Sequence, residues 1–246
     1  MKKYGLIGYP LEHSFSPQYF AQKFEKEGIQ DCRYDAYELP DFSTIHDLIA
    51  DPELLGLNIT IPHKVGALSL VNDLDPVAAH IGAINVMKRM KDGSWKGYNT
   101  DYYGILAALG TLKTASLWQQ KMALILGTGG SSMATEAALK FLGMQVYKVS
   151  RNLRDDQYSY DNISIDMLSE THLLVNCTPL GMHPKIHEAP PLPYGHLSAG
   201  TYALDLIYNP EKTLFLERCE KQGLKILNGL PVLIAQAEKS WEIWQS

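Results

Sequence analysis

The sequence predicts an α/β fold, in which apolar strands and helices alternate along both halves of the chain. In the first half, short apolar runs and helical segments follow one another in the order strand, helix, strand, helix, strand. In the second half, an apolar strand from about Met122 leads through the glycine turn Gly127–Ser132 into a helix. Several further strands follow, so a second α/β unit begins near Lys121.

The first half is expected to contain three strands separated by two helices, followed by a β-hairpin. The first helix starts at Ser16 and Pro17, because proline fits the first helical position and serine can bond the unpaired backbone amides. Gly28 is expected to end that helix. The strands are expected at 4–9, 34–39 and 55–61, the second helix at 42–49, the hairpin at 83–90 and 94–98, and another helix from Asp101.

The second half is expected to form a sheet of buried strands with helices between them. A loop rich in proline and histidine, 181–193, separates two of the later strands. The strands fall in the segments 122–126, 145–151, 172–179, 201–208 and 224–227, and helices are expected after the glycine turn, at about 211–222 and at about 232–244.

The composition describes an ordinary globular protein of one large or two modest domains. The chain has 246 residues, of which 46% are hydrophobic and 20% charged, so it can bury a substantial core. Its net charge of -5 argues against nucleic acid or an anionic membrane as the main partner. No apolar run approaches the roughly 18 residues of a membrane-spanning helix, and the N-terminal apolar run is too short for a signal peptide.

The cysteines and histidines suggest neither a metal site nor a disulfide framework. Cys32, Cys177 and Cys219 are far apart and form no Cys-x-x-Cys pair. The 8 histidines show no spacing typical of metal ligands, so no metal is expected. A reduced, cytoplasmic location is the simplest expectation.

The glycine turn has the layout of a dinucleotide-binding turn. Glycines let the backbone approach a pyrophosphate closely, and the following helix offers backbone amides and the positive end of its dipole. Gly127, Gly129 and Gly130 supply this pattern, while Ser132 stands where a third glycine would be. A merely tight strand-to-helix connection is the alternative, and the surrounding strands favour the nucleotide interpretation.

The strand after the glycine turn ends with arginines and without an acidic residue at its tip. An acid at this place would bind the ribose hydroxyls of NAD, whereas Arg151 and Arg154 suit the 2′-phosphate of NADP. The alternative is a solvated loop, which the nearby Asp155 and Asp156 keep open. NADP is therefore the expected cofactor, with NAD as the alternative.

Eight short motifs in a fixed order resemble those of the shikimate dehydrogenase family. They are spread over nearly the whole chain, and their number makes the resemblance specific although each is weak alone. The motifs are Ser14–Pro17, Asn58–Lys64, Gly82–Asn85, Tyr98–Gly104, Gly127–Gly130, Asn176–Met182, Asp205–Pro210 and Asn228–Ala237.

The resemblance implies two domains and one reaction. Residues 1–101, joined by a returning helix at 230–246, would bind substrate, and residues 102–229 would form a Rossmann domain that binds NADP. The implied reaction is the reversible, NADP-dependent reduction of 3-dehydroshikimate to shikimate, a step toward chorismate and the aromatic amino acids. The implied partners are these small molecules, and a monomer or a homodimer is expected.

The resemblance also implies roles for single residues. Lys64 and Asp101 match the catalytic pair. The lysine ammonium would stabilise the alkoxide left by hydride transfer, and Asp101 would hold the lysine in place. The implied substrate contacts are Ser14, Ser16, Thr60, Lys64, Asn85, Asp101, Tyr208 and Gln236, and the implied cofactor contacts are Gly127, Gly129, Gly130, Arg151, Arg154, Thr178, Met182 and Gly229.

Other interpretations of these residues remain open. Without the motif around it, Lys64 would be a surface lysine after a strand, and Ser16 caps a helix in any case. His63 is interpreted as a neighbour that shapes the turn rather than as an acid or base. The chain also departs from the family pattern at Ser150–Asn152, at Pro231 and Val232, and in a short segment, 154–171.

Two rival functions follow from these open points. One is a quinate/shikimate dehydrogenase that uses NAD, although serine at both positions 14 and 16 favours shikimate. The other is a ligand sensor without catalysis, which should have lost either the Lys64–Asp101 pair or the glycine turn. Both features are intact in this sequence.

Overall fold

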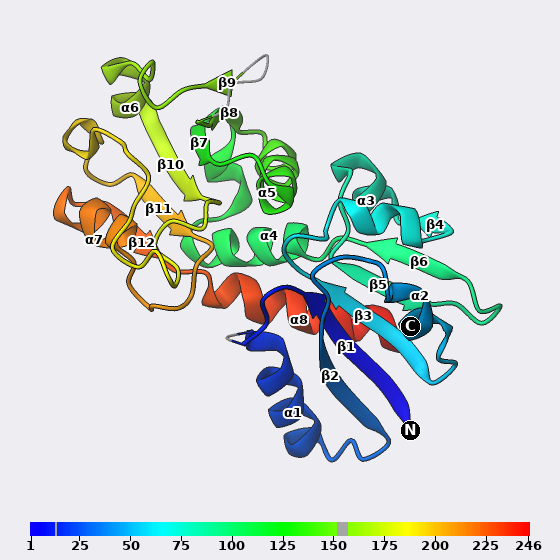
Figure 1. Ribbon diagram of the computed structural model, residues 1–246. Helices are drawn as coiled ribbons and strands as arrows, with labels where there is room; N and C mark the ends of the chain where they lie inside the picture. Colours follow the sequence, from blue (N-terminus) through cyan, green and yellow to red (C-terminus); the bar gives the residue numbers. More distant parts are fainter. Residues whose placement is uncertain (13, 152–156) are drawn as a thin grey trace. The chain divides into compact units, whose positions relative to one another are not determined.

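The computed structural model describes residues 1–12, 14–151 and 157–246, which form two compact units. The first unit comprises Met1–Asp101 together with Gln236–Ser246, and the second comprises Tyr102–Ala235. The closing helix, red in Figure 1, therefore begins in the second unit and ends in the first. Among the described residues, no helix combines the length and the apolar character that crossing a membrane requires.

The first unit is built on a mixed sheet of six strands in the order β2-β1-β3-β5-β6-β4. Strands β1, β2 and β3 are parallel, β5 runs antiparallel to β3, and β5 and β6 form the expected hairpin. Its elements are β1 (Lys2–Gly8), α1 (Phe15–Glu27), β2 (Cys32–Glu38), α2 (Ile45–Ala50), β3 (Leu54–Ile59), the 3-10 helix η1 (Gly66–Leu70), β4 (Asp73–Leu74), α3 (Pro76–Ile81), β5 (Val86–Arg89) and β6 (Trp95–Tyr98).

Two apolar clusters cover the two faces of this sheet. On one face, Phe20 and Phe24 of α1 pack with Ala237 and Trp244 of the returning helix against Tyr4. On the other face, residues of α2, η1 and α3 pack against the strands. Because neighbouring residues of a strand point to opposite faces, Ile59 lies in the second cluster while Asn58 points toward α1 and α8.

The first helix begins earlier than the sequence analysis predicted. Helix α1 starts at Phe15, so Ser14 and not Ser16 occupies the N-cap position, with an extended backbone and no side-chain cap hydrogen bond. Ser16 lies instead in the first turn and is buried. Gly28 ends the helix in the left-handed conformation at φ 67°, as expected.

The second unit is a doubly wound parallel sheet in the order β12-β11-β10-β7-β8-β9. Counted from β7, this is the strand order 6-5-4-1-2-3 of a dinucleotide-binding Rossmann fold read from the opposite edge. Its elements are α4 (Asp101–Leu112), η2 (Ala115–Trp118), β7 (Met122–Leu126), α5 (Gly130–Phe141), β8 (Gln145–Val149), β9 (Gln157–Tyr158), α6 (Ile165–Glu170), β10 (Thr171–Asn176), η3 (Tyr194–His196), β11 (Tyr202–Asp205), α7 (Leu214–Lys221), β12 (Lys225–Leu227) and α8 (Leu230–Gln245).

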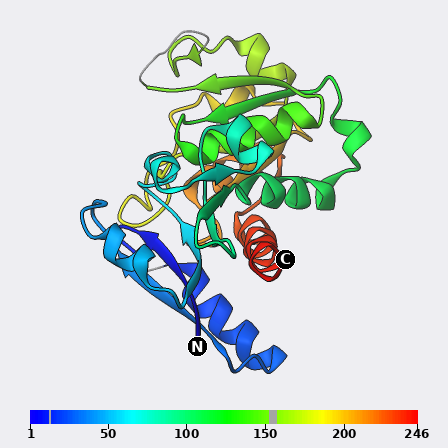
Figure 2. The same cartoon turned by 90° about the vertical axis from the view of Figure 1, so that its right-hand side faces the viewer.

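Helices cover both faces of the second sheet, as Figure 2 shows from a second direction. Residues of α4, α5 and the start of α8 pack on one face, and residues of α6 and α7 pack on the other. The central strands β7, β10 and β11 are almost wholly buried, which explains their continuous apolar sequence. The predicted α/β class is confirmed in both units.

The shortened segment 154–171 still contains a helix within its described part. Helix α6 has 6 residues and is capped by Ser164, whose hydroxyl accepts a hydrogen bond from the Met167 amide. The sequence analysis also missed α3, although Asp75 caps it, Pro76 starts it and Gly82 ends it at φ 73°. Short helices such as these lack the repeated apolar pattern on which the other assignments rested.

Candidate active site

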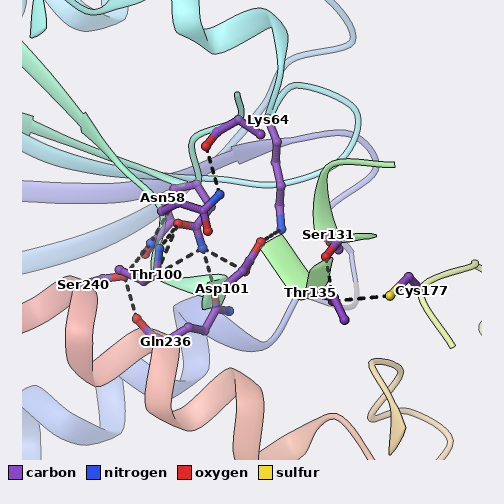
Figure 3. A network of polar contacts seen from close by, with 12 residues as sticks. Asn58, Lys64, Thr100, Asp101, Ser131, Thr135, Cys177, Gln236 and Ser240 are labelled. Carbon is purple, nitrogen blue, oxygen red and sulfur yellow. Dashed lines mark hydrogen bonds and ion pairs between the residues drawn. The ribbon is translucent and has the colours of Figure 1, made fainter. Parts of the chain in front are cut away.

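A lysine and a carboxylate meet beyond the ends of two strands of the first sheet. Lys64 follows strand β3, Asp101 follows β6, and the Lys64 Nζ lies 2.5 Å from Oδ2 of Asp101 (Figure 3). The two side chains are only 13% and 10% exposed. Such burial reduces the screening of this ion pair by water.

Asn85 joins this pair to the returning helix. Its Nδ2 lies 2.9 Å from Oδ1 of Asp101, 2.9 Å from Oε1 of Gln236 and 3.1 Å from Oγ1 of Thr100. Its Oδ1 accepts from the backbone amide of Thr100 at 2.6 Å, which fixes the orientation of the amide group. The two hydrogens of this NH₂ group therefore lie within reach of three acceptor oxygens.

A second group of buried polar side chains, Asn58, Thr100 and Ser240, lies beside Gln236 (Figure 3). The Asn58 Nδ2 donates to Oγ of Ser240 at 3.0 Å, and this hydroxyl lies 3.2 Å from that of Thr100. The hydroxyl of Tyr34 donates to Oδ1 of Asn58 at 2.7 Å. Asn58 on strand β3 is therefore anchored to the returning helix.

The predicted serine and threonine contacts lie at the same ends of the strands. Ser16 is buried and forms a hydrogen bond with the Tyr34 hydroxyl, whose pKa is raised well above its usual value by burial. Ser14 is half-buried at the N-cap of α1. Thr60 directly follows β3, and its amide donates to the carbonyl of Ile7 at 2.8 Å.

His63 has a structural environment that fits the turn-shaping interpretation. It is 7% exposed, one ring nitrogen lies 2.5 Å from the carbonyl oxygen of Leu39, and its ring packs on Phe42 at 4.4 Å. These contacts tie the turn before Lys64 to the end of β2.

The glycine turn of the second unit has the local form expected for phosphate binding. Gly127 has φ 106°, a conformation that favours glycine, and helix α5 starts at Gly130 with Gly129 as its N-cap. The Ser132 hydroxyl donates to the carbonyl of Gly127 at 2.8 Å and is buried. Ser132 thus closes the turn from inside, at the position where the nucleotide pattern has a third glycine. The residues therefore fit a dinucleotide at the start of α5.

The remaining residues that the motifs predict to contact the cofactor lie near the carboxyl ends of the parallel strands of the second unit. Arg151 follows β8 and is exposed, whereas Arg154 lies outside the described residues. Thr178 follows β10, and both its amide and its hydroxyl donate to Oδ1 of Asn176, at 3.0 and 2.7 Å. Met182 is 39% exposed.

Tyr208 and Gly229 lie near the same strand ends. Tyr208 follows β11 and is half-buried, and burial raises the pKa of its phenol. A Cβ at Gly229 would lie 2.2 Å from the carbonyl oxygen of Leu206, so only glycine fits there. In open α/β sheets the carboxyl ends of the strands are where ligands bind.

Several buried polar residues around these positions were missed by the sequence analysis. Some of them lie within the motifs, but none was predicted to have a role of its own. A polar residue inside or directly after an apolar strand was the available signal, because such groups are buried only when they are hydrogen-bonded. The missed residues are Asn58, Thr100, Asn176, Asp205, Thr213 and Ser240. No cluster of three or more potential metal ligands occurs among the described residues.

Comparisons with known proteins relate the whole chain to one family. A family model described as the shikimate dehydrogenase substrate binding domain matches residues 6–87. Two curated relatives carry the name shikimate dehydrogenase (NADP(+)). The protein from Nostoc sp. is 35% identical, with 99% of this chain and 90% of the relative covered. The protein from Staphylococcus aureus is 36% identical, with 98% and 92% covered.

A solved structure supports the same relationship. The crystal structure of shikimate 5-dehydrogenase from Thermus thermophilus, in complex with NADP(H) and shikimate, has a TM-score of 0.87 and 30% identity to this chain. The alignment covers 99% of this chain and 93% of the other. The similarity thus extends over both units.

Proposed function

Because the chain belongs to the shikimate dehydrogenase family, we propose that it catalyses the reversible, NADP-dependent reduction of 3-dehydroshikimate to shikimate. This activity makes it an oxidoreductase on the route to chorismate and the aromatic amino acids. The observation that carries the proposal is the buried contact of Lys64 with Asp101, beside Asn85 and Gln236. These are the residues that the motifs assign to catalysis and substrate binding.

In the proposed division of labour, the first unit binds the substrate and the second binds NADP. The substrate is a ring acid with several hydroxyl groups, so its site needs many hydrogen-bonding groups and few charges. Ser14 and Ser16 are proposed to hold the carboxylate. The ring hydroxyls and the ketone would then face Thr60, Lys64, Asn85, Asp101 and Gln236. Tyr208 is proposed as a further substrate contact.

The proposed chemistry assigns a distinct task to each charged group. NADPH, when bound, supplies the hydride that reduces the ketone carbon. The Lys64 ammonium stabilises the negative charge that develops on the ketone oxygen and carries a proton that this oxygen can take. Asp101 accepts from Lys64 and from Asn85, so it keeps the lysine oriented while it remains able to bind a ring hydroxyl.

The proposed cofactor site rests on the glycine turn and the strand ends of the second unit. Gly127, Gly129 and Gly130 would cradle the pyrophosphate at the start of α5. The exposed Arg151 would bind the 2′-phosphate as a planar, charged donor. The nicotinamide would face Thr178, Met182 and Gly229. We also propose a cytoplasmic location and a monomer or homodimer.

Initial-rate absorbance at the nicotinamide band tests the proposal. Shikimate and quinate are each offered with NADP and with NAD, using the wild type, Lys64→Ala and Lys96→Ala. Lys96 forms a 2.6 Å ion pair with Asp73 in the same unit, so its variant is a matched control for loss of a paired lysine. We expect turnover of shikimate with NADP, a loss on the order of 100-fold or more in Lys64→Ala, and no loss in Lys96→Ala.

The other outcomes of this experiment separate the rival functions. A preference for NAD would mean that Arg151 does not bind a phosphate, and turnover of quinate would mean that the two serines do not exclude it. A folded wild type that binds shikimate without turning it over would contradict the enzyme and support a ligand sensor. An Arg151→Ala variant should weaken NADP binding and leave NAD binding unchanged.

A further inference from the structure

Asp205 is a fully buried carboxylate for which the proposed mechanism has no use. It ends strand β11 and has 0% exposure. Burial raises the pKa of this carboxyl to about 6, and the hydrogen bonds that it accepts oppose the shift. A buried carboxylate destabilises a fold unless its oxygens are well bonded, so its contacts indicate what it holds.

Three segments of the second unit donate to this one carboxylate. Its Oδ1 accepts from Nδ2 of Asn176 and from the backbone amide of Ile207, both at 3.0 Å. Its Oδ2 accepts from the hydroxyl of Thr213 at 2.5 Å. The donors come from the end of β10, from the stretch after β11 and from the N-cap of α7. Asp205 therefore joins two neighbouring strand ends and the start of a helix.

Asn176 passes this constraint on to the loop that follows β10. A carboxylate only accepts hydrogen bonds, so the Asn176 amide must turn its NH₂ group toward Asp205. Its second hydrogen faces the carbonyl of Leu180 at 3.3 Å. This orientation leaves Oδ1 of Asn176 for the amide and the hydroxyl of Thr178. The position of Thr178 thus depends on Asp205 through a single side chain.

Close packing reinforces the same connection. Gly181 has φ 107°, and a Cβ there would lie 3.0 Å from Cβ of Thr213 and 3.6 Å from Cδ1 of Ile207. The loop after β10 thus lies directly on two residues whose groups donate to Asp205. It has no room to shift toward them.

We infer that Asp205 is a positioning residue, which sets the positions of Thr178 and Met182 in one loop and of Tyr208 in the next. This inference rests on the proposed function, because these three residues are among the proposed nicotinamide and substrate contacts of the second unit. Asp205 itself touches neither ligand in this arrangement. Its effect on catalysis runs through Asn176 and the Ile207 amide.

An Asp205→Ala variant of the full chain tests the inference with activity and with amide hydrogen exchange. We expect kcat to fall on the order of 10- to 100-fold, because small misplacements of contact residues have effects of that size. Amide exchange should accelerate in 176–182 and 206–208. Asp205→Asn should keep most of the wild-type kcat and most of the wild-type protection from amide exchange. Its side-chain oxygen can accept from Asn176 and Ile207 while its NH₂ group faces the Thr213 hydroxyl.

Ser164→Ala is the matched control for lost stability. Ser164 caps a helix of the same unit by the same kind of bond, but does not contact Asp205 in the described contacts. If Ser164→Ala lowers kcat as much as Asp205→Ala does, the effect is general destabilisation and the inference is wrong. Unchanged kcat and unchanged exchange in Asp205→Ala would overturn it as well.

Thr213→Val keeps the inference testable if Asp205→Ala fails to fold. This variant keeps the side-chain shape but removes the donor to Asp205, together with the acceptor of the Leu216 amide at the start of α7. We expect kcat to fall by about 10-fold. Thr213→Ser keeps the hydroxyl and should behave as the wild type. Equal kcat for Thr213→Val and Thr213→Ser, with equal exchange, would contradict the inference.

Failure of the proposed function gives a different result from failure of this inference. A wild type that turns over neither acid contradicts the function, whatever Asp205 does. Amide exchange and the affinity for NADPH, measured by nucleotide fluorescence, then decide on Asp205. Faster exchange with weaker NADPH binding in Asp205→Ala supports positioning, and wild-type values of both overturn it.

Discussion

The Lys64 Nζ lies 2.5 Å from Oδ2 of Asp101, although the two residues are 37 positions apart in the chain. The other oxygen of Asp101 accepts from Asn85 at 2.9 Å, so one carboxylate orients both a cation and an amide. A mutation that keeps the shape of this side chain but removes its negative charge can therefore test the two effects separately.

An Asp101→Asn variant should lose turnover while it keeps its fold. The amide oxygen can still accept from one neighbour, but it no longer attracts the Lys64 ammonium. We expect kcat to fall on the order of 100-fold, with a smaller change in the affinity for shikimate. Rates and calorimetric binding measure the two effects. Asp73→Asn, which weakens the exposed ion pair to Lys96, is the control and should retain full activity.

Ser240→Ala should destabilise the protein through the second group of buried polar side chains. Its hydroxyl accepts from Asn58, contacts Thr100 and donates to the carbonyl of Gln236, and it is fully buried. Removing it leaves buried polar groups without a partner, so we expect a loss of about 1–3 kcal/mol in unfolding free energy. Chemical denaturation measures the loss. Ser69→Ala, at an exposed hydroxyl, should cost less than about 0.5 kcal/mol.

Two glycine-to-alanine substitutions should have opposite effects on stability. At Gly229 the new Cβ would lie 2.2 Å from the Leu206 carbonyl oxygen, so Gly229→Ala should lose about 3 kcal/mol through overpacking. At Gly110, in helix α4, nothing lies within 4 Å, and Gly110→Ala should gain about 0.5–1 kcal/mol from reduced backbone freedom in the unfolded chain. Thermal unfolding of both variants checks the pair. A stable Gly229→Ala protein would show that the backbone there relaxes easily.

Asp205 should make part of the stability depend on pH. Its carboxyl has a pKa of about 6 in the folded protein and 3.8 in the unfolded chain, so the folded state holds its proton more tightly. The resulting stabilisation is fully present below the unfolded pKa and is lost as the pH rises through 6. A difference of about 2 between the two pKa values corresponds to about 3 kcal/mol of unfolding free energy.

A comparison of the wild type with Asp205→Asn isolates the contribution of Asp205 to the pH dependence of stability. The variant does not titrate at position 205, and the other groups contribute nearly equally to both proteins. The wild type should therefore lose stability relative to the variant between about pH 4 and about pH 7. Denaturation at several pH values measures the difference. A constant difference would show that the pKa of Asp205 is the same in both states.

Most of the fold could be predicted because the apolar patterns of strands and of helices are both strong in this sequence. The apolar strand Met122–Leu126 was found from its continuous apolar sequence, and the first helix was found from Pro17 near its start and Gly28 at its end. The start of α1 was misplaced because proline at 17 fits the first turn as well as the first position. Short elements escaped notice because a single turn carries no periodicity.

The residues of the candidate site could be predicted only in part. The motifs placed Lys64, Asp101, Asn85 and Gln236 in one site, and the structure brings these four side chains together. The groups that hold them, such as Ser240, could not be found because their partners are distant in sequence. Hydrogen bonding of this kind depends on the tertiary fold, and no local pattern reports it.

The returning end of helix α8 has a consequence for the order in which the chain folds during synthesis. Trp244 stacks on Tyr4 at 4.9 Å and donates to the carbonyl of Met87 at 3.0 Å, so the core of the first unit includes residues that are made after the whole second unit. Residues 102–235 leave the ribosome before this tryptophan does. The second unit can therefore complete its core first, while the first unit keeps an apolar face exposed until the end of α8 is made.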